Sequence, residues 1–415
     1  MIKFKVQVSD LLQAISVVSV VTPRPVDKAG GAGYLFVIRA GGSCTVYSQE
    51  QNHMAAAGLT LSDVEGEGAF IYPIEFIGGF KHLPDEETLS FETGERDGSY
   101  YVNYTTGMGG EAERPSFDPR SIRPATTPDP KEGDLEYPAN LLKRAIDTVK
   151  SGLPDDKNTK AKDFYKSIQV FDSSKPDWAP GDGNMFASDG TRGSYFYCDS
   201  FKGKALSVHK QNLTVITGFL SKCDGNVIVR NGENWTFLVD SQGRMIGWTH
   251  SALSHPKYSY YKEESIQLMV NTDFLCRTLR YMKEEMEASK SANGDRIRMV
   301  YEATPDAWCL QFLSKEAKGS VKSPLITVTP QTDEAKTKSF ATNVSIQQFL
   351  ELVSSLESKQ LLLKVLVSPP NDHKKKESFH FRILERFWVD PSGKVLPGPE
   401  GGIECRVTRF IPSKD

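Results

Sequence analysis

Hydrophobic and polar residues alternate at the start of the chain, where MIKFKVQV has the pattern of a β-strand. The pattern then changes to helical spacing in SDLLQAISVVSVV (9–21), where Ser9 or Asp10 can cap the first turn. The same change from strand to helix recurs in YPANLLKRAIDTVK (137–150) and in IQLMVNTDFLCRTLRYMKEEMEASK (266–290). The pattern therefore predicts three equivalent helices, each entered from a strand.

The apolar residues of the second and third helices fall on one face of each helix, as expected for helices that pack on a sheet. They are Leu141, Leu142, Ala145, Ile146 and Val149 in the second helix, and Phe274, Leu275, Leu279 and Met282 in the third. Thr272 or Asp273 can cap the third helix.

A second helix followed by a strand closes each third of the chain, in the stretches 72–93, 208–230 and 342–365. Alternating strands lie between the two helices of each third. Because the connections between strands are short, we expect antiparallel sheets with the helices on one side. The predicted fold class is α+β, with three repeated domains that each have two helices and antiparallel sheets.

Two stretches without hydrophobic periodicity separate the repeats. RPSFDPRSIRPATTPDPKEGD (114–134) contains five prolines, and HPKYSYYKEES (255–265) is the second such stretch. The predicted boundaries are a first domain at 1–118, a Pro-rich linker at 119–134, a second domain at 135–262 and a third domain at 263–415.

The composition is that of an ordinary globular protein, with 39% hydrophobic residues, 25% charged residues and a formal net charge of −3. No apolar run approaches the roughly 18 residues of a membrane span, and the N-terminus lacks the pattern of a secretory signal. Six scattered cysteines without a C-x-x-C pair favour buried free thiols in a reducing compartment. We expect a cytoplasmic protein with no membrane partner.

Motifs of catalysis are missing from the sequence. It contains no phosphate-binding G-x-x-x-x-G-K-[ST], no H-x-x-x-H and no G-x-S-x-G. Neither a nucleophile nor a group of metal ligands recurs in the three repeats. The sequence therefore predicts no catalytic residue, no metal site and no cofactor.

Positive charge does recur near the helices of all three repeats. The residues are Arg24 and Lys81 in the first repeat, Lys143, Arg144, Lys150, Lys210 and Lys222 in the second, and Arg277, Arg280 and Lys283 in the third. One interpretation is an ordinary solvated helix face. The other is a track of cations for the phosphates of a nucleic acid.

The stretch MFASDGTRGSYFYCD (185–199) has the pattern of a strand, a tight turn and a second strand. Arg192 lies at the tip of the turn, between Gly190 and Gly193. It is either a solvated side chain on a plain hairpin or part of a recognition surface.

Six stretches, in this order along nearly the whole chain, resemble the bacterial DNA polymerase III β sliding clamps. They are FKVQVSDLLQAISVVSVVTPRP, FKHLPDEETLSFE, KDFYKSIQVF, MFASDGTRGSYF, HPKYSYY and ATNVSIQQFLELVSSLES. The fourth is similar to the family's Ala-Thr-Asp-Gly-His-Arg-Leu, but Thr191 and Gly193 stand in place of His and Leu. The C-terminal CRVTRFIPSKD follows a Gly/Pro-rich insertion at 390–402 and replaces the family's Met-Pro-Met-Arg ending.

The resemblance implies a DNA-clamp fold that forms a ring, in which two chains join head to tail as a homodimer. Such a ring is not an enzyme. It encircles double-stranded DNA, slides without reading the sequence and acts as the processivity factor of a replicative polymerase. The polymerase and the clamp loader bind it through short hydrophobic peptides, and the protein is expected at the nucleoid.

The resemblance also implies roles for particular residues. DNA contacts are expected at Arg24, Lys81, Lys143, Arg144, Lys150, Lys210 and Arg277, with Phe164 and Tyr165 near the rim of the pore. A peptide-binding groove is expected at Thr191, Arg192, Gly193, Pro256, Tyr260, Tyr261, Phe410 and Ile411. Two alternatives stay open: an interaction scaffold without a replication role, and a nucleic-acid enzyme with unrecognised chemistry.

Overall fold

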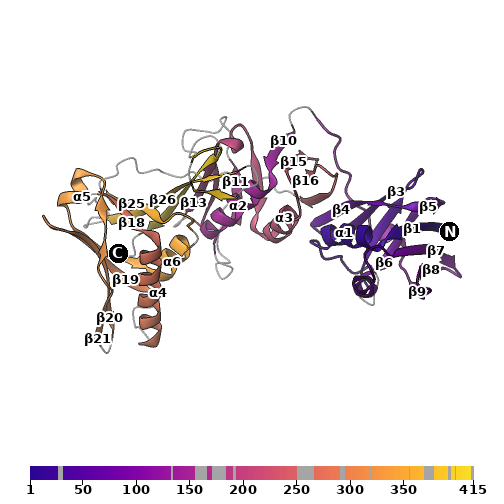
Figure 1. Ribbon diagram of the computed structural model, residues 1–415, viewed down its shortest axis with the longest axis horizontal. Helices are drawn as coiled ribbons and strands as arrows, with labels where there is room; N and C mark the ends of the chain where they lie inside the picture. The colour runs from indigo at the N-terminus through magenta and orange to yellow at the C-terminus, as the bar shows by residue number, and fades with distance from the viewer. Residues whose placement is uncertain are drawn as a thin grey trace. The chain divides into compact units, whose positions relative to one another are not determined.

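Helices and antiparallel sheets make up the chain in the computed structural model (Figure 1). The structure describes residues 1–26, 31–131, 134–154, 166–170, 184–189, 193–249, 266–289, 295–316, 319–354, 356–368, 378–390, 394–397 and 399–412. The chain divides into two compact units. The first comprises Met1–Lys143 and Gln211–Ala252, and the second comprises Arg144–Lys210 and Leu253–Asp415.

The first unit has two sheets. One is five-stranded in the order β5 (Ser62–Glu65), β1 (Ile2–Gln7), β7 (Thr88–Arg96), β8 (Ser99–Thr106) and β9 (Glu111–Pro115). The other is eight-stranded in the order β10 (Leu135–Pro138), β15 (Asn226–Asn231), β16 (Trp235–Asp240), β17 (Met245–Thr249), β4 (His53–Thr60), β3 (Ser43–Gln49), β2 (Gly33–Ile38) and β6 (Gly68–Pro73).

The second unit also has two sheets. The larger has the order β14 (Leu206–His209), β11 (Ser167–Val170), β12 (Asn184–Ser188), β13 (Gly193–Cys198), β28 (Ile403–Pro412), β26 (Ser378–Val389), β25 (Gln360–Ser368), β18 (Ile266–Asn271) and β23 (Thr329–Pro330), and β27 (Val395–Leu396) pairs with β26. The smaller has the order β21 (Gly319–Lys322), β20 (Trp308–Glu316), β19 (Arg296–Ala303) and β24 (Phe340–Ser345), and β22 (Ile326–Thr327) pairs with β20.

Helices connect the strands at equivalent points of the chain. The α-helices are α1 (Val8–Val18), α2 (Ala139–Val149), α3 (Leu213–Leu220), α4 (Thr272–Ala288), α5 (Asp333–Thr337) and α6 (Ile346–Ser354). The 3₁₀ segments are η1 (Ile74–His82), η2 (Pro119–Ser121), η3 (Lys150–Gly152), η5 (Asp199–Phe201) and η6 (Lys210–Asn212).

The same strand order occurs three times, which confirms the predicted repeat and the α+β class. One set of four strands reads β4-β3-β2-β6, β13-β12-β11-β14 and β21-β20-β19-β24 in the three repeats. The other reads β1-β7-β8-β9, β10-β15-β16-β17 and β18-β25-β26-β28. The exact boundaries of the three domains stay predictions.

Neighbouring repeats are joined by continuous sheets. In the first join, β17 of the second repeat pairs antiparallel with β4 of the first repeat. In the second join, β28 of the third repeat pairs antiparallel with β13 of the second repeat. The two sheets of the middle repeat therefore belong to different compact units.

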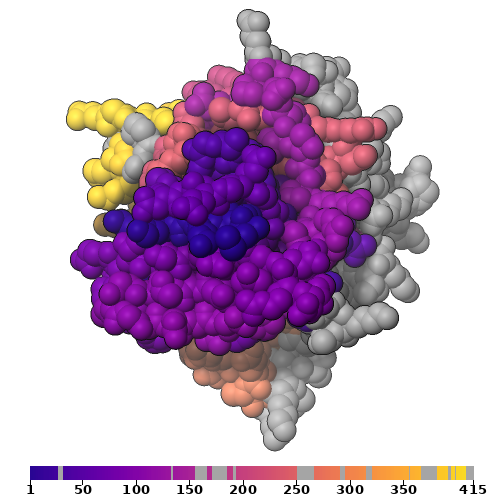
Figure 2. All heavy atoms as spheres, turned by 90° about the vertical axis from the view of Figure 1, so that its right-hand side faces the viewer, coloured from indigo at the N-terminus to yellow at the C-terminus, as the bar shows by residue number. Residues whose placement is uncertain are grey.

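The five-stranded sheet of the first unit has an open outer face (Figure 2). In this view the dark band of β1 crosses the face between β5 and the strands β7 to β9. A shallow depression on the face is lined by charged side chains, and two ion pairs cross it: Lys3 to Glu92 at 3.5 Å and Lys5 to Asp63 at 2.7 Å. β9 forms the outer edge of this sheet.

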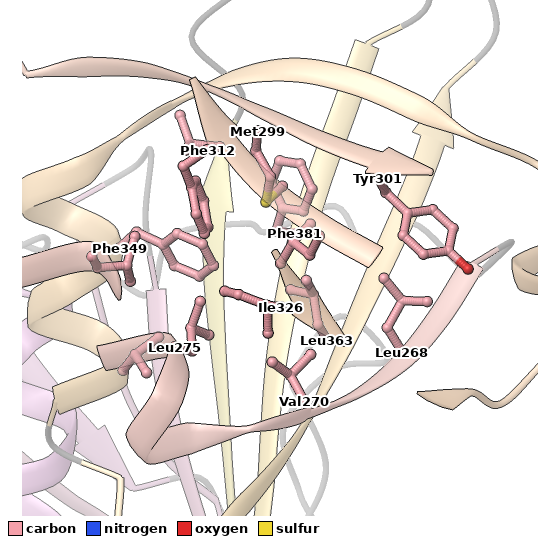
Figure 3. Close-up of a cluster of buried hydrophobic side chains, with 14 of the residues drawn as sticks. Leu268, Val270, Leu275, Met299, Tyr301, Phe312, Ile326, Phe349, Leu363 and Phe381 are labelled. Carbon is pink, nitrogen blue, oxygen red and sulfur yellow. The ribbon is translucent and has the colours of Figure 1, made fainter. Parts of the chain in front are cut away.

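The core of the third repeat shows how helices and sheets are held together (Figure 3). Leu275 of α4 and Phe349 of α6 point toward the sheet residues Phe312, Met299 and Leu363, and all five are fully buried. Phe312 and Phe349 meet edge to face, with ring centroids 6.0 Å apart. Burial of each such side chain stabilises the fold by about 1.5–3 kcal/mol.

Three local predictions were wrong. Helix α1 begins at Val8, before Ser9 and Asp10, and its N-cap Gln7 makes no side-chain capping bond. The cap of α4 is Asn271, whose Oδ1 accepts a hydrogen bond from the backbone N of Phe274 at 2.9 Å. Phe274 itself is 42% exposed rather than part of the buried face.

The second helix of the first repeat is a 3₁₀ segment, η1, rather than an α-helix. It contains two adjacent glycines, Gly78 and Gly79, which weaken an α-helix by about 1 kcal/mol each. Only Ile77 and Phe80 are buried in it, so little packing opposes that tendency.

Candidate functional site

The first join depends on small residues. Ala55 and Ala56 of β4 face Ile246 and Met245 of β17, and Gly247 faces Met54. A Cβ atom on Gly247 would lie 2.7 Å from the ring of Phe237, which is closer than real Cβ atoms approach. The missing side chain at residue 247 therefore makes room for the Phe237 ring of β16, and for Met54 across the join, whose Cγ would lie 3.2 Å from that Cβ atom.

A polar contact crosses the same join beside the sheet. His53 Nδ1 lies 2.7 Å from Glu50 Oε2, and His53 Nε2 lies 2.8 Å from Asn212 Oδ1. His53 and Glu50 belong to the first repeat and Asn212 to the second. Asn212 is 2% exposed, so His53 satisfies a polar group that water does not reach.

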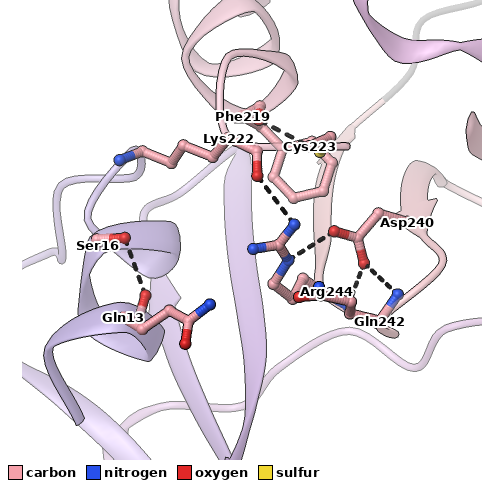
Figure 4. Close-up of polar contacts among 8 residues, drawn as sticks. All are labelled: Gln13, Ser16, Phe219, Lys222, Cys223, Asp240, Gln242 and Arg244. Carbon is pink, nitrogen blue, oxygen red and sulfur yellow. Dashed lines mark hydrogen bonds and ion pairs between the residues drawn. The ribbon is translucent and has the colours of Figure 1, made fainter. Parts of the chain in front are cut away.

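Strand β17 is fixed by a second group of polar contacts at its start (Figure 4). Arg244 donates from Nε to Asp240 Oδ2 at 2.6 Å and from Nη2 to the carbonyl of Lys222 at 2.9 Å. Asp240 Oδ1 accepts from the backbone N atoms of Gln242 and Arg244, both at 2.9 Å. These bonds tie the β16–β17 hairpin to the end of α3.

The second join brings part of the predicted peptide groove together. Gly193 on β13 is the register partner of Phe410 on β28. On the other side of β28, Phe410 faces Arg382 and Ile411 faces Phe381 of β26. Thr191, Arg192, Pro256, Tyr260 and Tyr261 lie outside the described residues.

A pair of buried thiols lies at the other end of the second join. Cys198 and Cys405 are register partners on β13 and β28 and are both 0% exposed. A hydrogen bond from the Cys405 thiol lowers the pKa of Cys198 to about 7, and the same contact together with burial raises the pKa of Cys405. Burial raises the pKa of Cys44, Cys223 and Cys276, so the Cys198 thiol differs from these.

Most of the predicted DNA-contacting cations already make contacts within the chain. Arg24 Nη2 donates to the carbonyl of Ser121 at 3.0 Å, and Lys210 Nζ donates to the carbonyl of Pro154 at 2.6 Å. Lys150 Nζ lies 2.6 Å from Asp147 Oδ1. Lys143 on α2 is partly buried.

Arg144 links α2 to the third repeat. Its Nη1 lies 2.9 Å from Glu357 Oε1, and its Cζ lies 5.8 Å from the ring centroid of Phe387. The carboxylate of the buried Glu385 accepts hydrogen bonds from the backbone N atoms of Glu357 and Ser358, which fixes that turn. A DNA phosphate would have to compete with Glu357 for this guanidinium group.

Lys81 and Arg277 are more open. Lys81 lies exposed near the end of η1, and Arg277 lies on the exposed face of α4. Phe164 and Tyr165 lie outside the described residues. Of the predicted DNA-contacting cations, Arg24, Lys81 and Lys143 belong to the first compact unit, and Arg144, Lys150, Lys210 and Arg277 belong to the second.

Two exposed aromatic residues on α4 were not predicted as site residues. Phe274 is 42% exposed and Tyr281 is 43% exposed, and Arg277 lies between them in the sequence. Their positions i, i+3 and i+7 place them on one side of the helix. That spacing was the sequence signal that could have identified Phe274 and Tyr281 as exposed residues on one side of α4. Phe274 also fits the spacing of the neighbouring apolar face.

Within the described part of the chain, no group of three His, Cys, Asp or Glu side chains could hold a metal ion. In the same residues, every helix is too short or too polar to cross a membrane.

Three repeats are joined in the same way twice, by β4 with β17 and by β13 with β28, which occupy equivalent positions in their repeats. This arrangement defines a clamp architecture. No protein-family model and no curated protein sequence matches the chain. Solved structures do match over its whole length, at low sequence identity. The chain has the fold of the DNA polymerase III β sliding clamps, so the resemblance seen in the sequence is confirmed for the fold.

Three of these structures illustrate the match. The DNA polymerase III β subunit of Thermotoga maritima has 13% identity and a TM-score of 0.69, with 100% of both chains covered. The β subunit of Pseudomonas aeruginosa has 12% identity and a TM-score of 0.71, with 100% and 99% covered. The sliding clamp of Bartonella birtlesii bound to griselimycin has 13% identity and a TM-score of 0.70, with 100% and 99% covered.

Proposed function

We propose that this protein is a sliding clamp, which encircles double-stranded DNA and keeps a replicative polymerase on its template. The observation that carries the proposal is the clamp fold over the full chain, with three repeats joined by continuous sheets. A clamp acts by topology and needs no catalytic group, so the protein is proposed not to be an enzyme. Its expected place in the cytoplasm, at the nucleoid, stays a prediction.

The repeat suggests how a ring would close. The first join uses β4 and β17, and the second join uses β13 and β28. The equivalent strands left at the ends of the chain are β9 in the first repeat and β21 in the third, and each lies at the edge of its sheet. We propose that β21 of one copy pairs with β9 of a second copy, twice, in a head-to-tail homodimer.

Charge at these edges supports the pairing. Glu111 and Glu113 are exposed on β9, and Lys322 is exposed on β21. Opposite charges on facing strands favour pairing, and like charges within one edge oppose its pairing with itself.

Contact with DNA would be loose and independent of sequence. The cations predicted for it are Arg24, Lys81, Lys143, Arg144, Lys150, Lys210 and Arg277, with Phe164 and Tyr165 at the rim. Contacts between cations and phosphates position a duplex without reading bases, as sliding requires. The net charge of −3 is compatible with that role because only the inner surface has to be basic.

We place the binding site for polymerase and clamp-loader peptides at the end of the second join. Gly193, Phe410 and Ile411 support it, since the strands bring them together there. Thr191, Arg192, Pro256, Tyr260 and Tyr261 are proposed to complete the groove. Deletion of the chain from Phe410 onward should abolish binding of a labelled Gln-x-x-Leu-Phe peptide, measured by fluorescence titration.

The proposed function is tested by native mass spectrometry and by retention on DNA. We expect a dimer of twice 46.1 kDa and slow loss from nicked circular DNA. Linearising the circle should release the protein, because a ring slides off an end. A monomer that leaves circular and linear DNA at the same rate would refute the proposal.

A further inference from the structure

Positive charge is unevenly shared among the helices of the chain. Helices α1, α3 and α6 contain no Lys or Arg. Helix α2 contains Lys143 and Arg144, and Arg144 pairs with Glu357. Helix α4 differs, because it carries Arg277, Arg280 and Lys283.

The first two of these cations are available to a ligand. Arg277 and Arg280 are exposed, and within the described part of the chain neither makes an ion pair or a hydrogen bond through its side chain. Lys283 lies 3.7 Å from Glu287 and is partly covered. Two guanidinium groups are therefore presented to solvent one turn apart.

Two aromatic rings lie on the same side of the helix. At 100° per residue, Phe274, Arg277, Arg280 and Tyr281 fall within an arc of about 120°. Leu275, Leu279, Met282 and Met286 occupy the opposite, buried side. We name the exposed set Phe274, Arg277, Arg280 and Tyr281 the aromatic–arginine face.

Exposing a large aromatic ring to water is energetically unfavourable, and a helix face that only contacts solvent does not need such a ring. The described residues contain few exposed large apolar side chains, and two of them, Phe274 and Tyr281, share this face. Isolated exposed apolar residues need no explanation, but two rings flanking two unpaired arginines are the combination that binds nucleic acid.

The combination of arginines and aromatic rings favours single-stranded over double-stranded nucleic acid. A duplex offers its phosphates to arginine but hides the faces of its bases within the stack. A single strand offers both, and stacking on an aromatic ring tolerates any base. Residues 274 to 281 span about 10 Å at 1.5 Å per residue. That length matches about three nucleotides of a stacked strand.

We propose that the aromatic–arginine face of α4 binds single-stranded DNA, with Arg277 and Arg280 on backbone phosphates and Phe274 and Tyr281 stacked on unpaired bases. The inference rests on the proposed clamp function for its setting, because the unpaired template beside a primer supplies such a strand. Exposed Asp273 at one end and exposed Glu284, Glu285 and Glu287 at the other end repel phosphates and limit the site to the residues between Asp273 and Glu284.

The test is the affinity of the full-length protein for fluorescently labelled oligo(dT) of 20 nucleotides, measured by anisotropy. Phe274→Ala with Tyr281→Ala should raise the Kd for oligo(dT) about tenfold or more and change the Kd for a duplex of equal length less than about twofold. Phe274→Leu with Tyr281→Leu keeps apolar side chains without rings and should lose affinity in the same way. Met108→Ala, at a residue 66% exposed in the first unit, is the control and should change neither Kd.

The arginines give a second measurement. Arg277→Ala with Arg280→Ala should weaken binding of both DNA forms and flatten the dependence of log Kd on log salt by about 1.4 for the single strand. Circular dichroism confirms that each variant is folded.

The outcomes separate this inference from the proposed function. Unchanged oligo(dT) affinity in both ring-removing variants overturns the inference, and so does an equal loss for duplex. The leucine variants binding like wild type would also overturn it, since apolar contact would then suffice. The dimer and its retention on circles are measured on the wild-type protein, so a failed ring refutes the clamp without touching the oligo(dT) result.

Discussion

The two joins use equivalent strands of the repeat but differ in length and in the chemistry of their side chains. The first join has four register pairs and is built around alanines and Gly247. The second has six pairs, and its strand β28 is also paired along its whole length with β26. The first join is thus a short contact built on small residues, and the second is a longer pairing that holds the hydrogen-bonded thiols of Cys198 and Cys405.

The difference shows that the repeat determines the backbone pairing of a join but does not determine the side chains beside it. The backbone pairing is the same in both joins because strand order is the same in each repeat. Side chains beside the joins then diverge: His53 bridges the first join, whereas Arg144 reaches Glu357 near the second. Only the second join ends at residues predicted to bind a peptide, Gly193 and Phe410.

The largest effect is expected from adding one methyl group to Gly247 in the first join. Gly247→Ala places a Cβ 2.7 Å from the Phe237 ring and 3.2 Å from Met54. We expect the free energy of unfolding to fall by about 2 kcal/mol, as for other overpacked cores. The measurement is chemical denaturation followed by circular dichroism.

Gly58→Ala is the matched control for that substitution. Gly58 lies in β4 of the same sheet, and a Cβ there would meet no atom within 4 Å. The control should change the unfolding free energy by less than about 0.5 kcal/mol. Equal effects of the two substitutions would mean that Gly247 is not tightly packed against Phe237 and Met54.

The His53–Asn212 contact at the first join should stabilise the protein more than the Arg144–Glu357 ion pair near the second join. His53→Ala leaves the buried Asn212 without its partner, which costs about 1–3 kcal/mol. Arg144→Ala breaks a partly exposed pair, and a double-mutant cycle with Glu357→Ala should give a coupling of only about 0.2–1 kcal/mol. The same denaturation experiment measures both, and a larger coupling for Arg144 would reverse the comparison.

The smallest expected effect concerns pH and the thiols of the second join. The Cys405 thiol lowers the folded-state pKa of Cys198 from 9.0 to about 7, so the unfolded chain binds more protons between these values. This contribution to stability is complete above pH 9 and is lost as the pH falls through 7. The urea midpoint of the wild type should therefore rise from pH 7 to pH 9 relative to that of Cys405→Ala, which lacks the donor.

Cys405→Ser keeps a hydroxyl donor at the same position and should keep the rise. The variants differ only in the titration of Cys198 and Cys405, because every other titrating group is shared. The raised pKa of Cys405 has the opposite effect on stability, but only as the pH approaches and passes 9.0, so the rise above pH 7 reports Cys198. Parallel pH profiles for the wild type and Cys405→Ala would show that the thiols are uncoupled.

Much of the fold could be predicted because the helices and strands produce local patterns of hydrophobic and polar residues in the sequence. Alternation and helical spacing identified the repeated order of strands and helices, and short connections indicated antiparallel sheets. The joins could not be predicted, since β4 and β17 pair across almost 200 positions of sequence and edge pairing leaves no local signal. The same distance hid the contact between Arg144 and Glu357.

Prediction of the candidate site was weaker for physical reasons. Recurrent cations were visible, but a sequence does not show which of them an acidic neighbour already engages, as Asp147 engages Lys150. Phe274 was assigned to the core because one residue of helical register separates the buried and exposed faces of α4. The roles of the proposed DNA-binding and groove residues stay predictions.

The division of the middle repeat between the two compact units has a consequence for how the chain can be cut. A fragment that ends at a repeat boundary would separate β17 from β4 or β28 from β13 and expose a long row of unsatisfied backbone groups. The repeat is the unit of sequence and of strand order, yet it is not a self-sufficient piece of protein. Each compact unit instead consists of one whole outer repeat together with one sheet of the middle repeat, so the natural places to divide this molecule lie within its middle repeat.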